Sequence, residues 1–268
     1  MKNKIITIKR YICGQEEFNF QELFLNTKYQ TETLPINVFL IEHKKYGNLL
    51  INTGCTKLLK KNAIQYSALK NKRKISFDDN SSIMTQLEAD DMDPLCIKKV
   101  LLTHCDPECC GALPLLPKYE ILSSAQVLCV LHFAYASEGV MKSTLPPKKI
   151  NRAATGLFNG ETLLKNYFKW IYDVLGDGSV LGVDLSGHAK AMMGFFIPEH
   201  NIFFAADTAI DERILDEELV PNEKLLSLQF DPNDYLSSLA TLRRLHRENP
   251  DIRLFFSHSI CDDSLLYQ

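Results

Sequence analysis

Short apolar runs separated by polar turns dominate this sequence and predict a series of β-strands. β-branched residues fill much of 5–12, and the runs 36–42 and 49–54 flank a polar turn at Gly47, which is the pattern of a β-hairpin. A second hairpin is predicted from 192–197 and 202–206. The remaining predicted strands cover 97–102, 121–130, 170–175, 180–185 and 252–256, the last strand of the chain.

Helical spacing is confined to fewer segments. Leucines at 236, 239, 242 and 245 predict an amphipathic helix that begins after 231–232 and ends at 249–250. Shorter helices are expected near 83–92 and over 131–142, and 56–80 is expected to be helical or irregular. Because neither an internal repeat nor a low-complexity linker interrupts this order, we predict one domain over residues 1–268.

Five predicted strands end in side chains that can bind a metal ion. These residues are Asn52, His104, His188, Asp207 and His258. A lone histidine at a strand end is more often structural than a ligand, so the ordered set carries the prediction rather than any one member. The densest group follows the strand 97–102, with metal-capable side chains at 104, 105, 106, 108, 109 and 110. A strand that delivers such groups to a loop is a common way to build an active site.

Charge and composition exclude some functions. The net charge of −3 and the lack of a Lys/Arg block argue against nucleic-acid binding. The densest basic run, 70–74, is interpreted as a solvated loop. No apolar run reaches the roughly 18 residues needed to span a bilayer, and the N-terminus lacks the apolar region of a signal peptide. We therefore expect a cytoplasmic protein without membrane contact.

The eight cysteines are expected to be reduced in that compartment. The absence of a C-x-x-C pair argues against a zinc ribbon or a thioredoxin-type motif. Cys13, Cys96 and Cys129 lie in apolar contexts and are predicted to be small core residues. Cys105 and Cys110 flank the metal-capable group, where a packing role is favoured over a redox role.

Residues 103–112, THCDPECCGA, resemble the T-H-x-H-x-D-H-x-G-G motif of the metallo-β-lactamase superfamily. Residues 52–54, Asn-Thr-Gly, resemble its D-T-G strand end, and the later G-H, D and H follow in the same order. The best match within the superfamily is with N-acyl-homoserine lactonases and glyoxalase II-like hydrolases. This resemblance implies an α/β fold, a four-layer αββα sandwich, with two metal ions that are usually zinc. A metal-activated water then attacks an ester, lactone, thioester or amide carbonyl.

Position by position, the resemblance assigns seven metal ligands. They are His104, Asp106, Glu108, Cys109, His188, Asp207 and His258. The first ion would be held by the ligands at 104, 106 and 188, and the second by those at 108, 109 and 258, with Asp207 bridging. Asp207 and Glu108 are the predicted catalytic residues.

Three of the seven positions depart from the motif, since Asp106, Glu108 and Cys109 stand where it has His, Asp and His. Each replacement is itself a metal ligand, which favours retention of metal. Two motif carboxylates and a thiolate join Asp207 as negative groups, so a bound water should lose its proton less readily than in the usual site. The mixed ligands suit zinc best, with iron as the second choice. Ile210 stands where lactonases carry a tyrosine that polarises the substrate.

The leading interpretation is a hydrolase with an atypical dinuclear site, acting on a small ester, lactone or thioester. Two alternatives stay open: a diiron-type redox enzyme on the same scaffold, and a metal-free pseudoenzyme that acts as a binding protein. A metal-independent mechanism, with Cys109 as the nucleophile beside His258 or His188, ranks third. The sequence predicts a small-molecule substrate as the partner and leaves the oligomeric state open.

Overall fold

The computed structural model describes residues 4–133, 140–148, 150–216, 219–261 and 265–267. The chain divides into two compact units. Unit 1 comprises Met1–Glu17, Thr33–Ala154 and Ile260–Gln268, and unit 2 comprises Phe18–Glu32 and Thr155–Ser259. That the whole chain acts as one domain stays a prediction.

Unit 1 is built on an eight-stranded sheet. In spatial order its strands are β16 (Leu265–Tyr267), β1 (Ile5–Asn19), β3 (Thr31–His43), β4 (Gly47–Ile51), β6 (Ile97–Leu101), β7 (Glu120–Ser123) and β8 (Asn151–Ala154), with β5 (Lys74–Ser76) paired to β1. The first predicted hairpin is confirmed as β3–β4, in which Phe39 lies opposite Ile51. From β4 to β8 the neighbouring strands are parallel, so their carboxyl ends share one edge of the sheet.

Helices connect the strands of unit 1. The α-helices are α2 (Ala63–Lys72), α3 (Ile83–Ala89), α4 (Pro107–Cys110) and α5 (Ala125–Phe133), and 3₁₀ turns cover Lys57–Lys61, Pro94–Cys96 and Lys142–Thr144. The helix expected near 83–92 is confirmed as α3. The strand predicted over 121–130 is only partly correct, because β7 ends at Ser123. There the Ser124 hydroxyl accepts a hydrogen bond from Val127 N–H at 3.1 Å and caps the start of α5, which occupies the rest of the predicted range. The helix predicted over 131–142 falls partly on 134–139, outside the described residues.

Unit 2 is built on a six-stranded sheet. In spatial order its strands are β15 (Arg253–Phe255), β13 (Ile202–Phe204), β12 (Met193–Ile197), β11 (Leu181–Asp184), β10 (Ile171–Asp173) and β9 (Gly156–Leu157), and β2 (Phe24–Leu25) pairs separately with β14 (Val220–Pro221). The second predicted hairpin is confirmed as β12–β13, and β13 and β15 are parallel. Their carboxyl ends lead to Asp207 and His258.

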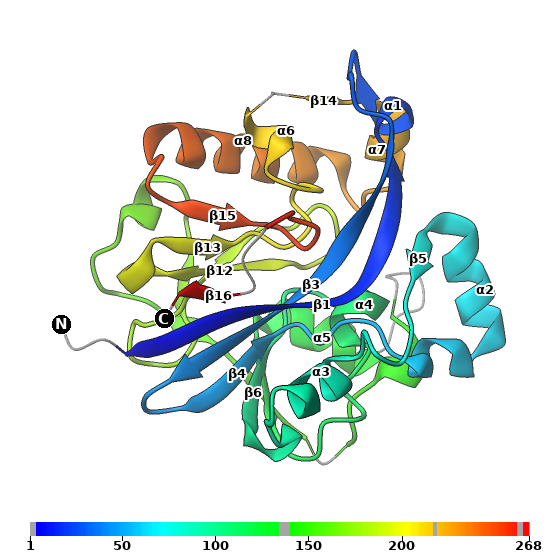
Figure 1. Ribbon diagram of the computed structural model, residues 1–268. Helices are drawn as coiled ribbons and strands as arrows, with labels where there is room; N and C mark the ends of the chain where they lie inside the picture. Colours follow the sequence, from blue (N-terminus) through cyan, green and yellow to red (C-terminus); the bar gives the residue numbers. More distant parts are fainter. Residues whose placement is uncertain (1–3, 134–139, 149, 217–218, 262–264, 268) are drawn as a thin grey trace. The chain divides into compact units, whose positions relative to one another are not determined.

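The predicted leucine-rich helix is confirmed as α8 (Pro232–Glu248), drawn in orange in Figure 1. The Asp231 carboxylate caps it by accepting from the N–H groups of Asn233 and Asp234. Leu239, Leu242 and Leu245 are buried on its apolar face, whereas Leu236 is 40% exposed. Shorter helices of unit 2 are α1 (Phe20–Leu23), α6 (Arg213–Asp216), α7 (Glu223–Ser227) and the 3₁₀ turns Leu163–Asn166 and Pro198–His200. Among the described residues, no helix is both long and apolar enough to span a membrane.

Three further expectations, one about a strand and two about cysteines, need correction. The last strand of the chain is β16 rather than 252–256. Cys129, predicted to lie in the core with Cys13, is exposed because it is on the solvent side of α5, and Cys96 is only half-buried.

Candidate metal-binding residues

His104 is the most completely enclosed of the predicted ligands in unit 1. Its ring is fully buried, and its Nδ1 lies 2.9 Å from the Thr103 hydroxyl oxygen. The Thr103 hydroxyl donates its single proton to Asn52 Oδ1 at 3.0 Å, so His104 Nδ1 is the donor in the contact with Thr103. The lone pair of His104 is therefore on Nε2, as in metal-binding histidines whose other nitrogen is held by a hydrogen bond.

Asn52 connects the ends of two neighbouring strands. It follows β4 with a φ of +59°, in the left-handed region that asparagine tolerates better than most residues. Its side-chain oxygen also accepts from the backbone N–H of Thr103, at 3.0 Å, just beyond β6. The residue that replaces the motif aspartate thus fixes the segment that carries His104.

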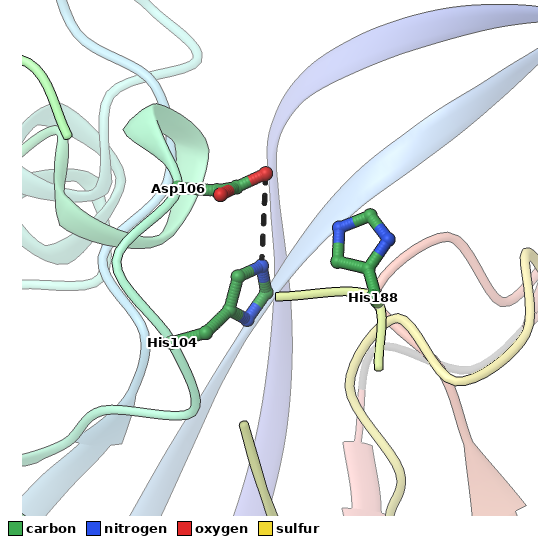
Figure 2. Close-up of side chains that lie close together, drawn as sticks. All are labelled: His104, Asp106 and His188. Atoms are coloured by element: carbon green, nitrogen blue, oxygen red, sulfur yellow. Dashed lines mark ion pairs between the residues drawn. The ribbon is translucent and has the colours of Figure 1, made fainter. Parts of the chain in front are cut away.

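Asp106 and Cys109 lie beside His104. Asp106 Oδ2 is 3.9 Å from His104 Nε2, the contact drawn as a dashed line in Figure 2. Cys109 Sγ is 3.7 Å from both ring nitrogens of the same histidine. Glu108 and Cys109 belong to α4, which starts at Pro107 in the first helical position, where proline is favoured. Local structure therefore brings together three predicted ligands of this unit, His104, Asp106 and Cys109.

The other two cysteines of the motif are packed in the core. Cys105 is 3% and Cys110 is 1% exposed, as the packing prediction requires. A hydrogen bond with Cys105 and burial raise the pKa of the Cys110 thiol well above its usual value, which keeps it protonated. A protonated thiol is a poor metal ligand.

Arg73 is a member of this group that sequence reasoning missed. Its guanidinium contacts the carboxylates of Glu16, Asp106 and Glu108. The interpretation of 70–74 as a solvated loop is therefore wrong: 70–72 end α2, Lys74 begins β5, and the Arg73 side chain is only 20% exposed. The contact with Glu16 joins residues 57 positions apart, which no local pattern reveals.

The three carboxylates keep Arg73 charged. Burial lowers the pKa of the guanidinium, but the carboxylates of Glu108 and then Glu16 raise it by more, and the net shift is upward. Glu108 is 2% and Glu16 is 3% exposed, so both carboxylates are screened little by solvent. The expected excess of negative charge in the motif is accompanied by an internal cation.

In unit 2, His188 is oriented by Gln229. The Gln229 amide nitrogen donates to the Leu225 carbonyl at 2.9 Å, which directs its oxygen toward His188 Nδ1 at 3.1 Å. His188 Nδ1 is therefore the donor, and its Nε2 carries the lone pair. That Nε2 lies 3.6 Å from Asp207 Oδ2.

Asp207 faces two histidines. Its Oδ1 lies 4.0 Å from His258 Nε2, so each carboxylate oxygen is directed at a different imidazole. Asp207 is 7% and His258 is 3% exposed, and the ring of Phe18 packs edge-on against His258 at 4.8 Å. The structure thus brings together the three predicted ligands of unit 2. Ile210, three residues after Asp207, is buried at 8% exposure.

A comparison with known protein families shows the family of this chain. The sequence profile of the metallo-beta-lactamase superfamily matches residues 31–258, which covers both groups of ligands. The chain belongs to this superfamily. No curated protein matches the sequence of this chain.

Solved structures of the superfamily share the fold over nearly the whole chain. An N-acyl homoserine lactone hydrolase with N-hexanoyl-L-homoserine bound at its catalytic metal centre aligns with a TM-score of 0.71 and 16% identity, over 96% of this chain and 95% of that chain. AidC, a dizinc quorum-quenching lactonase, gives 0.63 and 15%, over 98% and 92%. A probable metal-dependent hydrolase from Staphylococcus aureus gives 0.67 and 14%, over 97% and 91%. At such low sequence identity the structural similarity bears on the fold alone. It confirms the predicted α/β fold of the metallo-β-lactamase type.

Most of these side chains are of a type that could bind the metal ions typical of the superfamily. Imidazole Nε2 atoms and carboxylate oxygens are ligands for zinc and iron. The guanidinium of Arg73 does not fit the pattern, since it pairs with Asp106 and Glu108, two of the motif carboxylates. The joint action of all seven residues, and the catalytic roles of Glu108 and Asp207, stay predictions.

Proposed function

We propose that this chain is a metal-dependent hydrolase that acts on a small ester, lactone or thioester. The observation that carries the proposal is the arrangement around Asp207, whose two oxygens face His188 and His258. His104 and His188 each have one ring nitrogen held by a hydrogen bond. Fixed tautomers with Nε2 as the acceptor are what a metal-binding site requires and what a surface histidine has no need of.

In this proposal some residues bind the metal ion and others orient the residues that bind it. Under the family assignment, His104, Asp106, His188 and Asp207 would hold a divalent ion. Thr103 and Gln229 keep the two imidazoles in the metal-binding tautomer. A divalent ion bound there supplies Lewis acidity, which lowers the pKa of water and polarises a carbonyl. Asp207, with its two flanking histidines, would accept the proton that the water gives up.

The fold and one substitution support the proposed substrate class. The solved homoserine lactone hydrolases bind N-acyl-homoserine products. Ile210 offers no hydroxyl where lactonases carry a tyrosine, so polarisation of a lactone carbonyl from that position is lost. Acyclic esters and thioesters, the substrates of glyoxalase II-like hydrolases, are therefore favoured over lactones.

The metal that the protein retains tests this proposal. Protein purified without chelator should contain zinc and hydrolyse members of an ester and thioester panel. The variant His188→Ala should lose metal and activity together, whereas His132→Ala, which changes an exposed histidine of α5, should keep both. Iron without hydrolysis would favour the redox alternative, and a chain that takes up neither metal would favour the metal-free binding protein.

A further inference from the structure

The guanidinium of Arg73 uses all three of its nitrogens on carboxylates. Nε donates to Glu16 Oε1 at 2.8 Å, and Nη2 donates to the other oxygen of Glu16, which makes a bidentate pair. Nη1 donates to Asp106 Oδ2 at 3.0 Å and is also ion-paired with Glu108 Oε1. One nitrogen, Nη1, thus lies between two carboxylates of the metal motif.

The backbone fixes this position from two sides. Arg73 follows α2, and its N–H donates to the Leu69 carbonyl at 2.8 Å as the helix ends. The next residues form β5, which pairs with β1 in the register Glu16↔Ile75 and Glu17↔Lys74. Strand pairing therefore places Glu16 beside Arg73, and the bidentate pair aims Nη1 at α4 and the residue before it.

The guanidinium of Arg73 supplies a positive charge to two carboxylates that the family assignment gives to metal ions. It is planar, permanently charged and less strongly hydrated than an ammonium group, which suits a buried position between carboxylates. Asp106 Oδ2, the oxygen that accepts from Nη1, is also the oxygen nearest His104 Nε2. A second divalent ion bound to Glu108 would have to displace Nη1 or share its carboxylate with a like charge.

We propose that Arg73 stands in for the second metal ion of the superfamily, so that the chain binds a single divalent ion. Glu16, outside the motif, is the residue that holds the substitute cation in place. This inference rests on the proposed metal-dependent function, and it replaces the expected pair of ions by one ion and one guanidinium. Glu108 then acts as the partner of Arg73 rather than as a catalytic residue.

The number of bound ions tests the inference. Metal-free wild-type protein should take up one Zn²⁺ per chain in calorimetric titration and by elemental analysis after gel filtration. Arg73→Gln removes the charge and should take up two. Arg73→Lys loses the bidentate geometry but keeps the charge, and should take up one. Lys72→Gln makes the same net-charge change at an exposed neighbour and should also take up one.

Cobalt gives a second measurement that does not depend on activity. The second equivalent of Co²⁺ added to Arg73→Gln should bring in the near-ultraviolet charge-transfer band of a thiolate, supplied by Cys109. Cys109→Ser in the same background should remove that band. If Arg73→Gln is unfolded without metal, two equivalents of Zn²⁺ should be needed to restore its circular dichroism.

The outcomes separate this inference from the proposed function. Wild-type protein with two ions would overturn the role of Arg73 and leave the hydrolase proposal standing. One ion in both wild type and Arg73→Gln would show that Arg73 does not exclude the second ion. Wild-type protein with no ion would overturn both proposals.

Discussion

Asn52 Oδ1 accepts two hydrogen bonds from Thr103, one from the backbone N–H and one from the hydroxyl, each at 3.0 Å. Both partners are buried, and the two bonds hold the ends of β4 and β6 together. Because the same hydroxyl accepts from His104, the position of Asn52 determines which nitrogen of His104 is available to a metal.

Replacing Asn52 should therefore affect stability and metal binding together. Asn52→Ala loses both hydrogen bonds and places an alanine at a φ of +59°, which should cost about 3 kcal/mol of unfolding free energy. Asn52→Asp keeps the acceptor and the tolerated backbone conformation, and should cost less than Asn52→Ala. Urea unfolding of the metal-free proteins measures both values. Equal losses in the two variants would contradict the role given to the side-chain oxygen.

Gly187 should tolerate no side chain. Its φ is +132°, and a Cβ there would lie 2.1 Å from the backbone nitrogen of Tyr235. Gly187→Ala should therefore push α8 away from the segment that carries His188 and destabilise the chain by about 3 kcal/mol or more. Gly176→Ala is the matched control, because its φ is also positive, +77°, but nothing lies within 4 Å of the added atom. It should cost about 1 kcal/mol from backbone strain alone. Thermal unfolding of the two variants decides whether the close approach matters.

Glu212 should give the stability of the protein a distinctive pH dependence. Burial raises the pKa of its carboxyl above the usual 4.5, although a hydrogen bond with Ser259 works in the opposite direction. The folded state therefore binds this proton more tightly than the unfolded state. Its contribution to stability is fully present below pH 4.5 and is lost as the pH rises through the higher folded value.

Urea unfolding between pH 4 and pH 7 measures this effect. Glu212→Gln should be less destabilised by rising pH than wild type over that range, since the amide carries no charge. Glu161→Gln, at a side chain that is 95% exposed, should leave the profile unchanged. Parallel profiles for wild type and Glu212→Gln would rule out the contribution of Glu212.

The elements predicted correctly are those whose signals are local. Both hairpins and α8 are encoded by alternation, turn residues and leucine spacing within a few neighbouring positions. The boundary between β7 and α5 falls inside the predicted strand 121–130, because the two serines at 123–124 are compatible with a strand, and the Ser124 cap marks where the helix begins. His43 begins the turn between β3 and β4, yet it is only 2% exposed, and its Nδ1 accepts from the N–H groups of Lys45 and Tyr46.

For the candidate site, too, the residues with local sequence signals could be predicted and the others could not. The order of strand-end ligands could be predicted, and within each unit the structure brings most of them together, as His188, Asp207 and His258 show. Arg73 could not be predicted, because its position depends on the pairing of β5 with β1 across more than fifty residues. A basic run in a sequence gives the charge of a side chain and says nothing of the carboxylates that the fold places around it.

The dependence of hydrolysis on metal is the most direct test of the proposed function. Thioester hydrolysis should be measured on wild-type protein as purified, after removal of metal with a chelator, and after addition of Zn²⁺. We expect the rate to fall by at least about 100-fold on chelation and to recover with Zn²⁺ in wild type but not in His188→Ala. Hydrolysis that is unchanged by complete removal of metal would contradict the proposal and would favour Cys109 as a nucleophile.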